Sequence, residues 1–171
     1  MDFLNLIFSV LATILSAEWF KGLVISIGVI VAIVSVMSAK TTARRKQTAD
    51  LMFGTRADEK LSQGYKRLAQ LHNAEDANMR ALAKDDKRNS DEANEVRYVL
   101  NHWERVFVGL RQGIYDEKML REANYNTVLN TWAQAKPYIE AVRETEKKQT
   151  YYQCLERYAE QWKRKPLELL R

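Results

Sequence analysis

The sequence predicts an all-α protein in which one or two N-terminal transmembrane segments precede a cytoplasmic bundle of four to five helices. Three observations support this prediction. Residues 1–39 hold only three charged side chains, whereas residues 40–171 hold the other 46. In that polar part, apolar residues recur at helical spacing. Six glycines and two prolines are too few for the turns of an all-β fold.

Residues 22–39 are predicted to form a transmembrane helix. They contain no charged residue and would rise roughly 27 Å as a helix, close to the ~30 Å thickness of a hydrocarbon core. The flank 40–46 follows with four basic residues, which are expected to contact anionic lipid headgroups: Lys40, Arg44, Arg45 and Lys46. Under the positive-inside rule, this flank places residues 47–171 in the cytoplasm as a helical domain at the cell inner membrane.

Residues 3–17 are apolar but would rise only ~22 Å as a helix, less than a usual span. They either form a helical hairpin with residues 22–39, turning at residues 18–21, or lie flat in the membrane interface. Small and polar residues form one stripe on each segment: Asn5, Ser9, Thr13 and Ser16 on the first, and Gly28, Ala32, Ser35 and Ala39 on the second. In the flat arrangement the second stripe has no partner within the chain, so we expect a homo-oligomer.

Five segments of the polar part have helical periodicity. The first covers about residues 51–72, with Gly54 as a break and Thr55 opening a capping box. A short segment surrounds Met79 and Leu82. The third begins at Asn89 and holds the clearest apolar stripe, between residues 96 and 110.

Glycine and proline set the remaining boundaries. Gly113 is predicted to end the third segment in a left-handed conformation, and Asp116 to cap the fourth. Pro137 should break or kink the fourth segment near its end. The fifth segment surrounds residues 152–162, before Pro166.

The sequence holds no motif that carries chemistry by itself. His72 and His102 lie thirty residues apart without metal-binding partners, and Cys154 is the only cysteine. Glycine-rich phosphate loops are absent from the sequence, so we expect no metal, no cofactor and no enzymatic activity. Three polar residues share a face of the third segment and form a candidate docking face for an unknown protein: Asn101, Glu104 and Arg111. Nucleic acid is disfavoured as a partner because basic residues alternate with acidic ones.

The runs VLNHWE at residues 99–104 and VGLRQGIYDE at residues 108–117, with Trp132 and residues 137–139, resemble the signature of an uncharacterised family of small bacterial and phage proteins. That family is catalogued as a domain of unknown function, and the resemblance covers about residues 45–163. It implies a helical fold and membrane attachment, suggests prophage or defence genes, and adds no catalytic residue.

These observations lead to two functional hypotheses. We expect a membrane-anchored, non-enzymatic interaction or regulatory module. The alternative is an oligomerising effector that permeabilises the inner membrane, for which the two stripes of small residues would supply the helix contacts.

Overall fold

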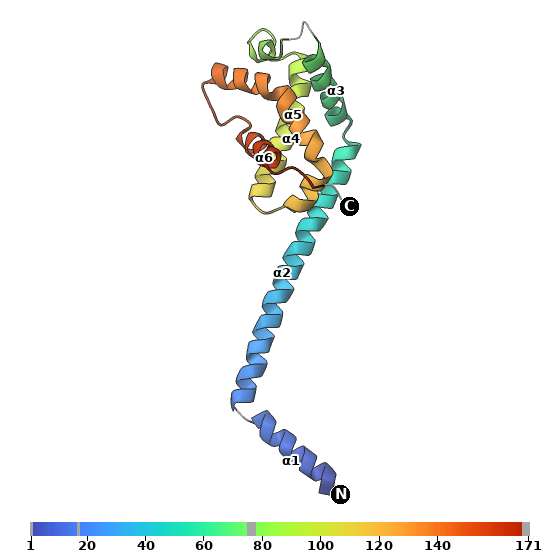
Figure 1. Ribbon diagram of the computed structural model, residues 1–171, viewed down its shortest axis with the longest axis vertical. Helices are drawn as coiled ribbons and strands as arrows, with labels where there is room; N and C mark the ends of the chain where they lie inside the picture. The colour runs from blue at the N-terminus through green and yellow to red at the C-terminus, as the bar shows by residue number, and fades with distance from the viewer. Residues whose placement is uncertain (1, 17, 75–77, 169–171) are drawn as a thin grey trace. The chain divides into compact units, whose positions relative to one another are not determined.

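The computed structural model describes residues 2–16, 18–74 and 78–168, and in this part of the chain it contains helices and no strand (Figure 1). The elements in order are α1 (Asp2–Ser16), α2 (Glu18–Ala57), α3 (Glu59–Asn73), the short 3-10 helix η1 (Met79–Ala83), α4 (Asp91–Arg111), α5 (Glu117–Glu146) and α6 (Gln153–Arg164). The all-α prediction is confirmed. Two compact units divide the chain, Met1–Ala43 and Arg44–Arg171.

The first unit consists of α1 and the apolar part of α2, whose large apolar side chains are exposed. Over an 18-residue window α2 has a mean hydropathy of 2.5 with none of it buried, and in the described part of the chain it is the one helix long and apolar enough to cross a membrane. The predicted turn at residues 18–21 is wrong, because these residues belong to α2 and Lys21 pairs with Glu18 at 2.7 Å. The choice between a hairpin and a flat helix stays a prediction.

Gly54 does not break the first predicted segment, since α2 continues through it to Ala57. The predicted capping box at Thr55 is also wrong. The Thr55 hydroxyl donates to the Leu51 carbonyl at 2.7 Å within α2, and the cap of α3 is instead Asp58, whose carboxylate accepts from the Leu61 N–H at 3.0 Å. A threonine hydroxyl bonded back into its own helix is not free to cap the next one.

Ser90 rather than Asn89 caps α4, accepting from the Ala93 N–H at 3.2 Å. Gly113 has a φ of 71° and Asp116 accepts from the Met119 N–H, so both of these predictions are confirmed. Pro137 does not end α5, which continues to Glu146. The residues after the proline include three buried ones, Tyr138, Ile139 and Ala141, and their packing offsets the hydrogen bond that proline removes.

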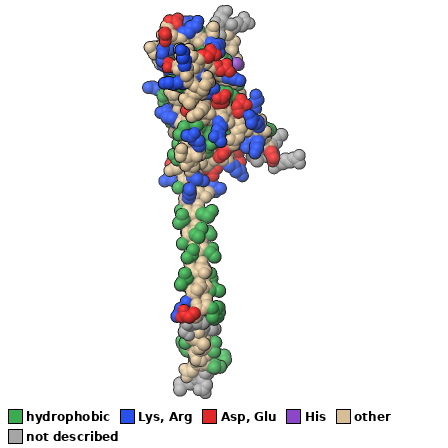
Figure 2. All heavy atoms as spheres, turned by 90° about the vertical axis from the view of Figure 1, so that its left-hand side faces the viewer, with side chains coloured by type: hydrophobic (Ala, Val, Ile, Leu, Met, Phe, Trp, Pro, Cys, Tyr) green, Lys and Arg blue, Asp and Glu red, His purple; other side chains and the backbone are tan. Residues whose placement is uncertain are grey.

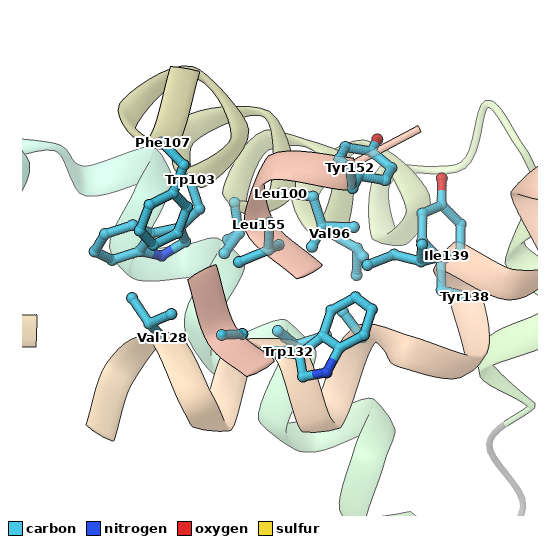
Figure 3. Packing of buried hydrophobic residues seen from close by; sticks show 14 of the residues in the cluster. Val96, Leu100, Trp103, Phe107, Val128, Trp132, Tyr138, Ile139, Tyr152 and Leu155 are labelled. Atoms are coloured by element: carbon cyan, nitrogen blue, oxygen red, sulfur yellow. The ribbon is translucent and has the colours of Figure 1, made fainter. Parts of the chain in front are cut away.

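The hydrophobic core of the second unit forms where α4 meets α3, α5 and α6 (Figure 3). Its centre is aromatic. Phe107 of α4 stacks on Tyr158 with ring centroids 4.9 Å apart and meets the edge of Trp162 at 5.4 Å. Trp103 is 1 % exposed and its indole N–H donates to the Tyr65 hydroxyl at 2.8 Å, which satisfies the one polar group of this buried ring.

α3 and α4 pack closely at Gly64. A Cβ atom at this position would lie 2.5 Å from Val99 Cγ2 and 2.8 Å from the carbonyl oxygen of Glu95. No such contact exists at Gly54, where a Cβ would meet nothing within 4 Å. Glycine is therefore required sterically at the first position and not at the second.

Replacing Gly64 with alanine should destabilise the second unit by roughly 1–3 kcal/mol, because α3 and α4 must move apart. The control Gly54→Ala should stabilise it by about 0.5–1 kcal/mol, because alanine favours a helix interior over glycine. Urea unfolding of the chain in detergent, followed by circular dichroism, measures both effects. A Gly64→Ala variant as stable as the wild type would contradict the close packing.

Candidate functional site

The loop between α4 and α5 is bound to the first turns of α2 that belong to the second unit. Thr48 is fully buried, and its hydroxyl accepts from the Asp116 N–H at 2.8 Å while donating to the Arg44 carbonyl at 2.8 Å. Arg44 Nε donates to the Gly113 carbonyl at 2.6 Å, and Arg45 lies 3.6 Å from the Asp116 carboxylate. We call these five residues the α2 junction.

The shape of the loop makes this junction possible. Gly113 adopts a left-handed conformation, and a Cβ there would lie 2.7 Å from Arg44 Nη2, so its lack of a side chain admits the guanidinium. Asp116 uses its side chain to cap α5 and its backbone N–H to bind Thr48. One loop therefore ends α4, begins α5 and holds α2.

The four residues predicted to bind headgroups have different surroundings. Lys40 belongs to the first unit and is exposed, as are Arg45 and Lys46 of the second unit. Arg44 is partly buried and its Nε is occupied by the Gly113 carbonyl. Headgroup binding stays a prediction, but Arg44 has a structural role that sequence reasoning missed.

The residues predicted for membrane packing lie in the first unit. Ser9, Thr13, Gly28, Ala32 and Ser35 are exposed, and a Cβ built at Gly28 would meet nothing within 4 Å. The side chain of Ser16 lies outside the described residues. Contact through these two stripes stays a prediction.

The predicted docking face is not a single solvent-facing surface. Asn101 and Arg111 are exposed, whereas the Glu104 carboxylate accepts from the backbone N–H groups of Cys154 at 3.1 Å and Leu155 at 2.9 Å. The first N–H groups of a helix have no partner within it, and the N-cap residue of α6, Tyr152, makes no side-chain hydrogen bond to them. Glu104 therefore caps α6 from another helix.

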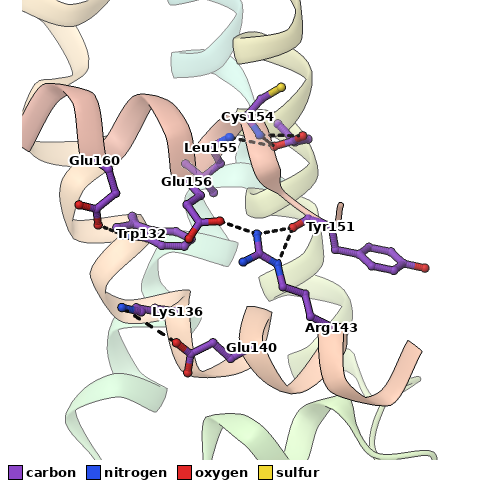
Figure 4. Close-up of polar contacts among 10 residues, drawn as sticks. Trp132, Lys136, Glu140, Arg143, Tyr151, Cys154, Leu155, Glu156 and Glu160 are labelled. Carbon is purple, nitrogen blue, oxygen red and sulfur yellow. Dashed lines mark hydrogen bonds and ion pairs between the residues drawn. The ribbon is translucent and has the colours of Figure 1, made fainter. Parts of the chain in front are cut away.

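The segment between α5 and α6 is also held by side chains. Arg143 donates to the Tyr151 carbonyl at 2.7 Å and pairs with Glu156 at 2.8 Å (Figure 4). Lys147 and Tyr152 adopt left-handed φ values of 52° and 55°, which side chains other than glycine disfavour. The surrounding contacts maintain this conformation.

A small pocket of about 90 Å³ lies beside this segment, and its lining includes Arg88, Arg97, Tyr138, Glu146 and Tyr152. Glu146 accepts from Arg88 at 3.0 Å, so the acidic group of the pocket already has a partner. Burial raises the pKa of the Tyr138 and Tyr152 hydroxyls, so both ionise less readily than a solvent-exposed tyrosine.

The residues singled out in the sequence, His72, His102 and Cys154, do not line this pocket. Burial raises the pKa of the Cys154 thiol and disfavours the reactive thiolate. Burial lowers the pKa of His102, whose ring meets the edge of Trp103 at 5.3 Å. Among the described residues, no group of three or more His, Cys, Asp or Glu side chains could hold a metal ion.

Comparison with known proteins identifies a family. The model of a family described as a domain of unknown function, DUF4760, matches residues 22–162. The matched region includes the apolar run of α2, the α2 junction and most of α6. No curated protein and no solved structure matches the chain.

Replacing Thr48 with valine should lower the free energy of unfolding by about 1–3 kcal/mol, because the Asp116 N–H loses its partner in a buried place. Thr48→Ser keeps the hydroxyl and should cost less. Urea unfolding in detergent compares the two variants with the wild type. If valine and serine have equal effects, the hydroxyl does not hold the loop.

Proposed function

On the premise that the chain belongs to the DUF4760 family, whose function is unknown, we propose that it is a membrane-anchored, non-enzymatic interaction module with its helical domain in the cytoplasm. The single observation that carries this proposal is α2. One continuous helix holds the uncharged, exposed residues 22–39, then four basic residues, and then Thr48, which is buried in the second unit.

The charge distribution along α2 supports the orientation. Residues 40–46 hold four basic residues and no acidic one, and short basic flanks of this kind stay in the cytoplasm. The other flank of the apolar run is different, because Lys21 is paired with Glu18. The second unit follows the basic flank and is expected on the same side of the membrane.

The use of polar side chains in the second unit favours binding over catalysis. Glu104 caps α6, Arg143 holds the Tyr151 carbonyl, and Asp116 caps α5. Each of these charged groups is engaged with backbone atoms, where it stabilises the fold. Catalysis needs such groups to converge on a pocket that can admit a substrate.

For the partner surface, we propose exposed residues of α4 that keep Asn101 and Arg111 of the predicted docking face and leave out Glu104, which caps α6. Asn101, Arg105, Val108 and Arg111 are all exposed and are spaced four, three and three residues apart, so they lie along one side of the helix. Val108 is 37 % exposed and adds an apolar contact between two arginines. The surface thus combines arginine with apolar area, as protein interfaces do.

Anchoring and orientation can be tested by cysteine labelling in intact bacterial cells, in a Cys154→Ala background. A membrane-impermeant maleimide should label Glu18→Cys from outside and should label Asn89→Cys only after permeabilisation. The protein should also stay in the membrane pellet after alkaline carbonate extraction. Labelling of Asn89→Cys in intact cells would reverse the orientation, and release by carbonate would refute the anchor.

The interaction module and the membrane effector make different predictions. A photo-crosslinking residue at Val108 should form a discrete covalent adduct with another protein, whereas one at Lys87, an exposed residue outside this surface, should not.

Expression of the chain should leave the membrane potential unchanged, as read by a voltage-sensitive dye. Rapid depolarisation that disappears in Gly28→Leu would instead support the effector, because the open face around Gly28 would then join copies of the chain.

A further inference from the structure

Two basic clusters that lie far apart in the sequence meet at one end of the second unit. α2 brings Arg45 to within 3.6 Å of Asp116 at the start of α5. The C-terminal end of α6 is held at the same place, because the Gln161 side chain and the Trp162 indole donate to the Glu117 carboxylate at 3.3 and 3.4 Å. The residues that follow Trp162 are Lys163, Arg164 and Lys165.

We call the following exposed residues the basic end: Arg45, Lys46, Lys118, Lys163, Arg164 and Lys165. Figure 2 shows how Lys and Arg side chains are distributed over one face of the molecule. Arg45 pairs with Asp116, and Lys118 lies 4.0 Å from Glu122. Within the described part of the chain, the three basic residues at the end of α6 have no carboxylate within 4.0 Å, so their charges are available to a ligand.

Exposed apolar side chains accompany these charges. Ile114, in the loop that holds Arg44, is 44 % exposed, and Leu167, two residues after Lys165, is 37 % exposed. Basic residues combined with exposed apolar ones are typical of surfaces that bind an anionic bilayer, because the charges attract lipid phosphates and the apolar groups enter the interface.

Arg45 and Lys46 of the basic end follow the proposed anchor closely in sequence. Arg44 is the first residue of the second unit and comes five residues after Ala39, where the uncharged run ends. Five helical residues rise only ~7.5 Å. If residues 22–39 span the bilayer, Arg44 and the adjoining Arg45 and Lys46 therefore follow the span closely enough along α2 to reach the lipid headgroups.

We propose that the basic end binds anionic phospholipid headgroups, and that Lys163, Arg164 and Lys165 make this contact for the C-terminal part of the chain. The inference rests on the proposed membrane anchoring. It assigns a ligand to the three consecutive basic residues after Trp162, and it predicts that lipid composition controls how the C-terminal part of the chain meets the membrane surface.

The test uses the full chain in nanodiscs of phosphatidylcholine, with or without phosphatidylglycerol, in a Cys154→Ala background. An environment-sensitive fluorophore is placed at Glu168→Cys, beside the basic end, or at Gln149→Cys, beyond the far end of α5. Quenching by spin-labelled lipid should increase with phosphatidylglycerol at residue 168 and should not change at residue 149. High salt should reverse the effect.

Charge reversal provides matched variants. Changing Lys163, Arg164 and Lys165 together to glutamate should lower the ratio of membrane-bound to free C-terminal segment by roughly a hundredfold or more. The control variant replaces three exposed lysines near the other end of α5 with glutamate, Lys84, Lys87 and Lys148, which changes the net charge by the same amount. It should leave the ratio of membrane-bound to free C-terminal segment unchanged.

Each outcome has a separate meaning. A chain that does not incorporate into nanodiscs refutes the anchor and with it this inference. If the chain incorporates but quenching at residue 168 does not depend on phosphatidylglycerol, the inference is refuted and the anchor stands. Loss of lipid-dependent quenching on adding a short DNA duplex, with a larger affinity for the duplex than for the lipid, would assign the basic end to nucleic acid and overturn the proposal.

Discussion

Burial of the apolar side of α4 is the constraint on which the second unit depends. α4 contributes Trp103 and Phe107 to the core, and both α3 and α6 pack against it. Gly64 lets α3 come close, while Tyr158 and Trp162 of α6 pack on Phe107. Because α6 is only twelve residues long, it is too short to be stable in isolation and depends on this aromatic contact and on the cap from Glu104.

Much of the fold follows from local sequence signals. The periodic spacing of apolar residues predicts the position of α4, and Gly113 and Asp116 predict the loop after it, because each requirement involves neighbouring residues only. The uncharged run at residues 22–39 is equally local. A local signal fails where a tertiary contact outweighs it: α5 continues past Pro137 because residues beyond it are buried, so the predicted break is wrong, while the predicted kink stays a prediction.

In the candidate site, contacts between residues far apart in the sequence matter more than local signals. Thr48 and Asp116 are 68 residues apart, and no spacing rule connects a threonine in a basic flank to a loop between two later helices. Spacing along α4 groups Glu104 with the candidate docking face, yet its carboxylate binds the backbone N–H groups of Cys154 and Leu155 at the start of α6. Spacing within one helix predicts on which side of that helix a residue lies. Which other segment packs against that side depends on the path of the whole chain.

The placement of the four tryptophans has an optical consequence. Trp103, Trp132 and Trp162 are at most 5 % exposed and lie in the core of the second unit, whereas Trp19 is 67 % exposed at the start of α2. The indole emission of the chain is therefore the sum of one surface signal and three interior signals. A Trp19→Phe variant would leave a spectrum that reports only on the helical domain. The difference between the two spectra would report on the polarity around the N-terminal end of α2, so the chain carries separate intrinsic probes for its two units.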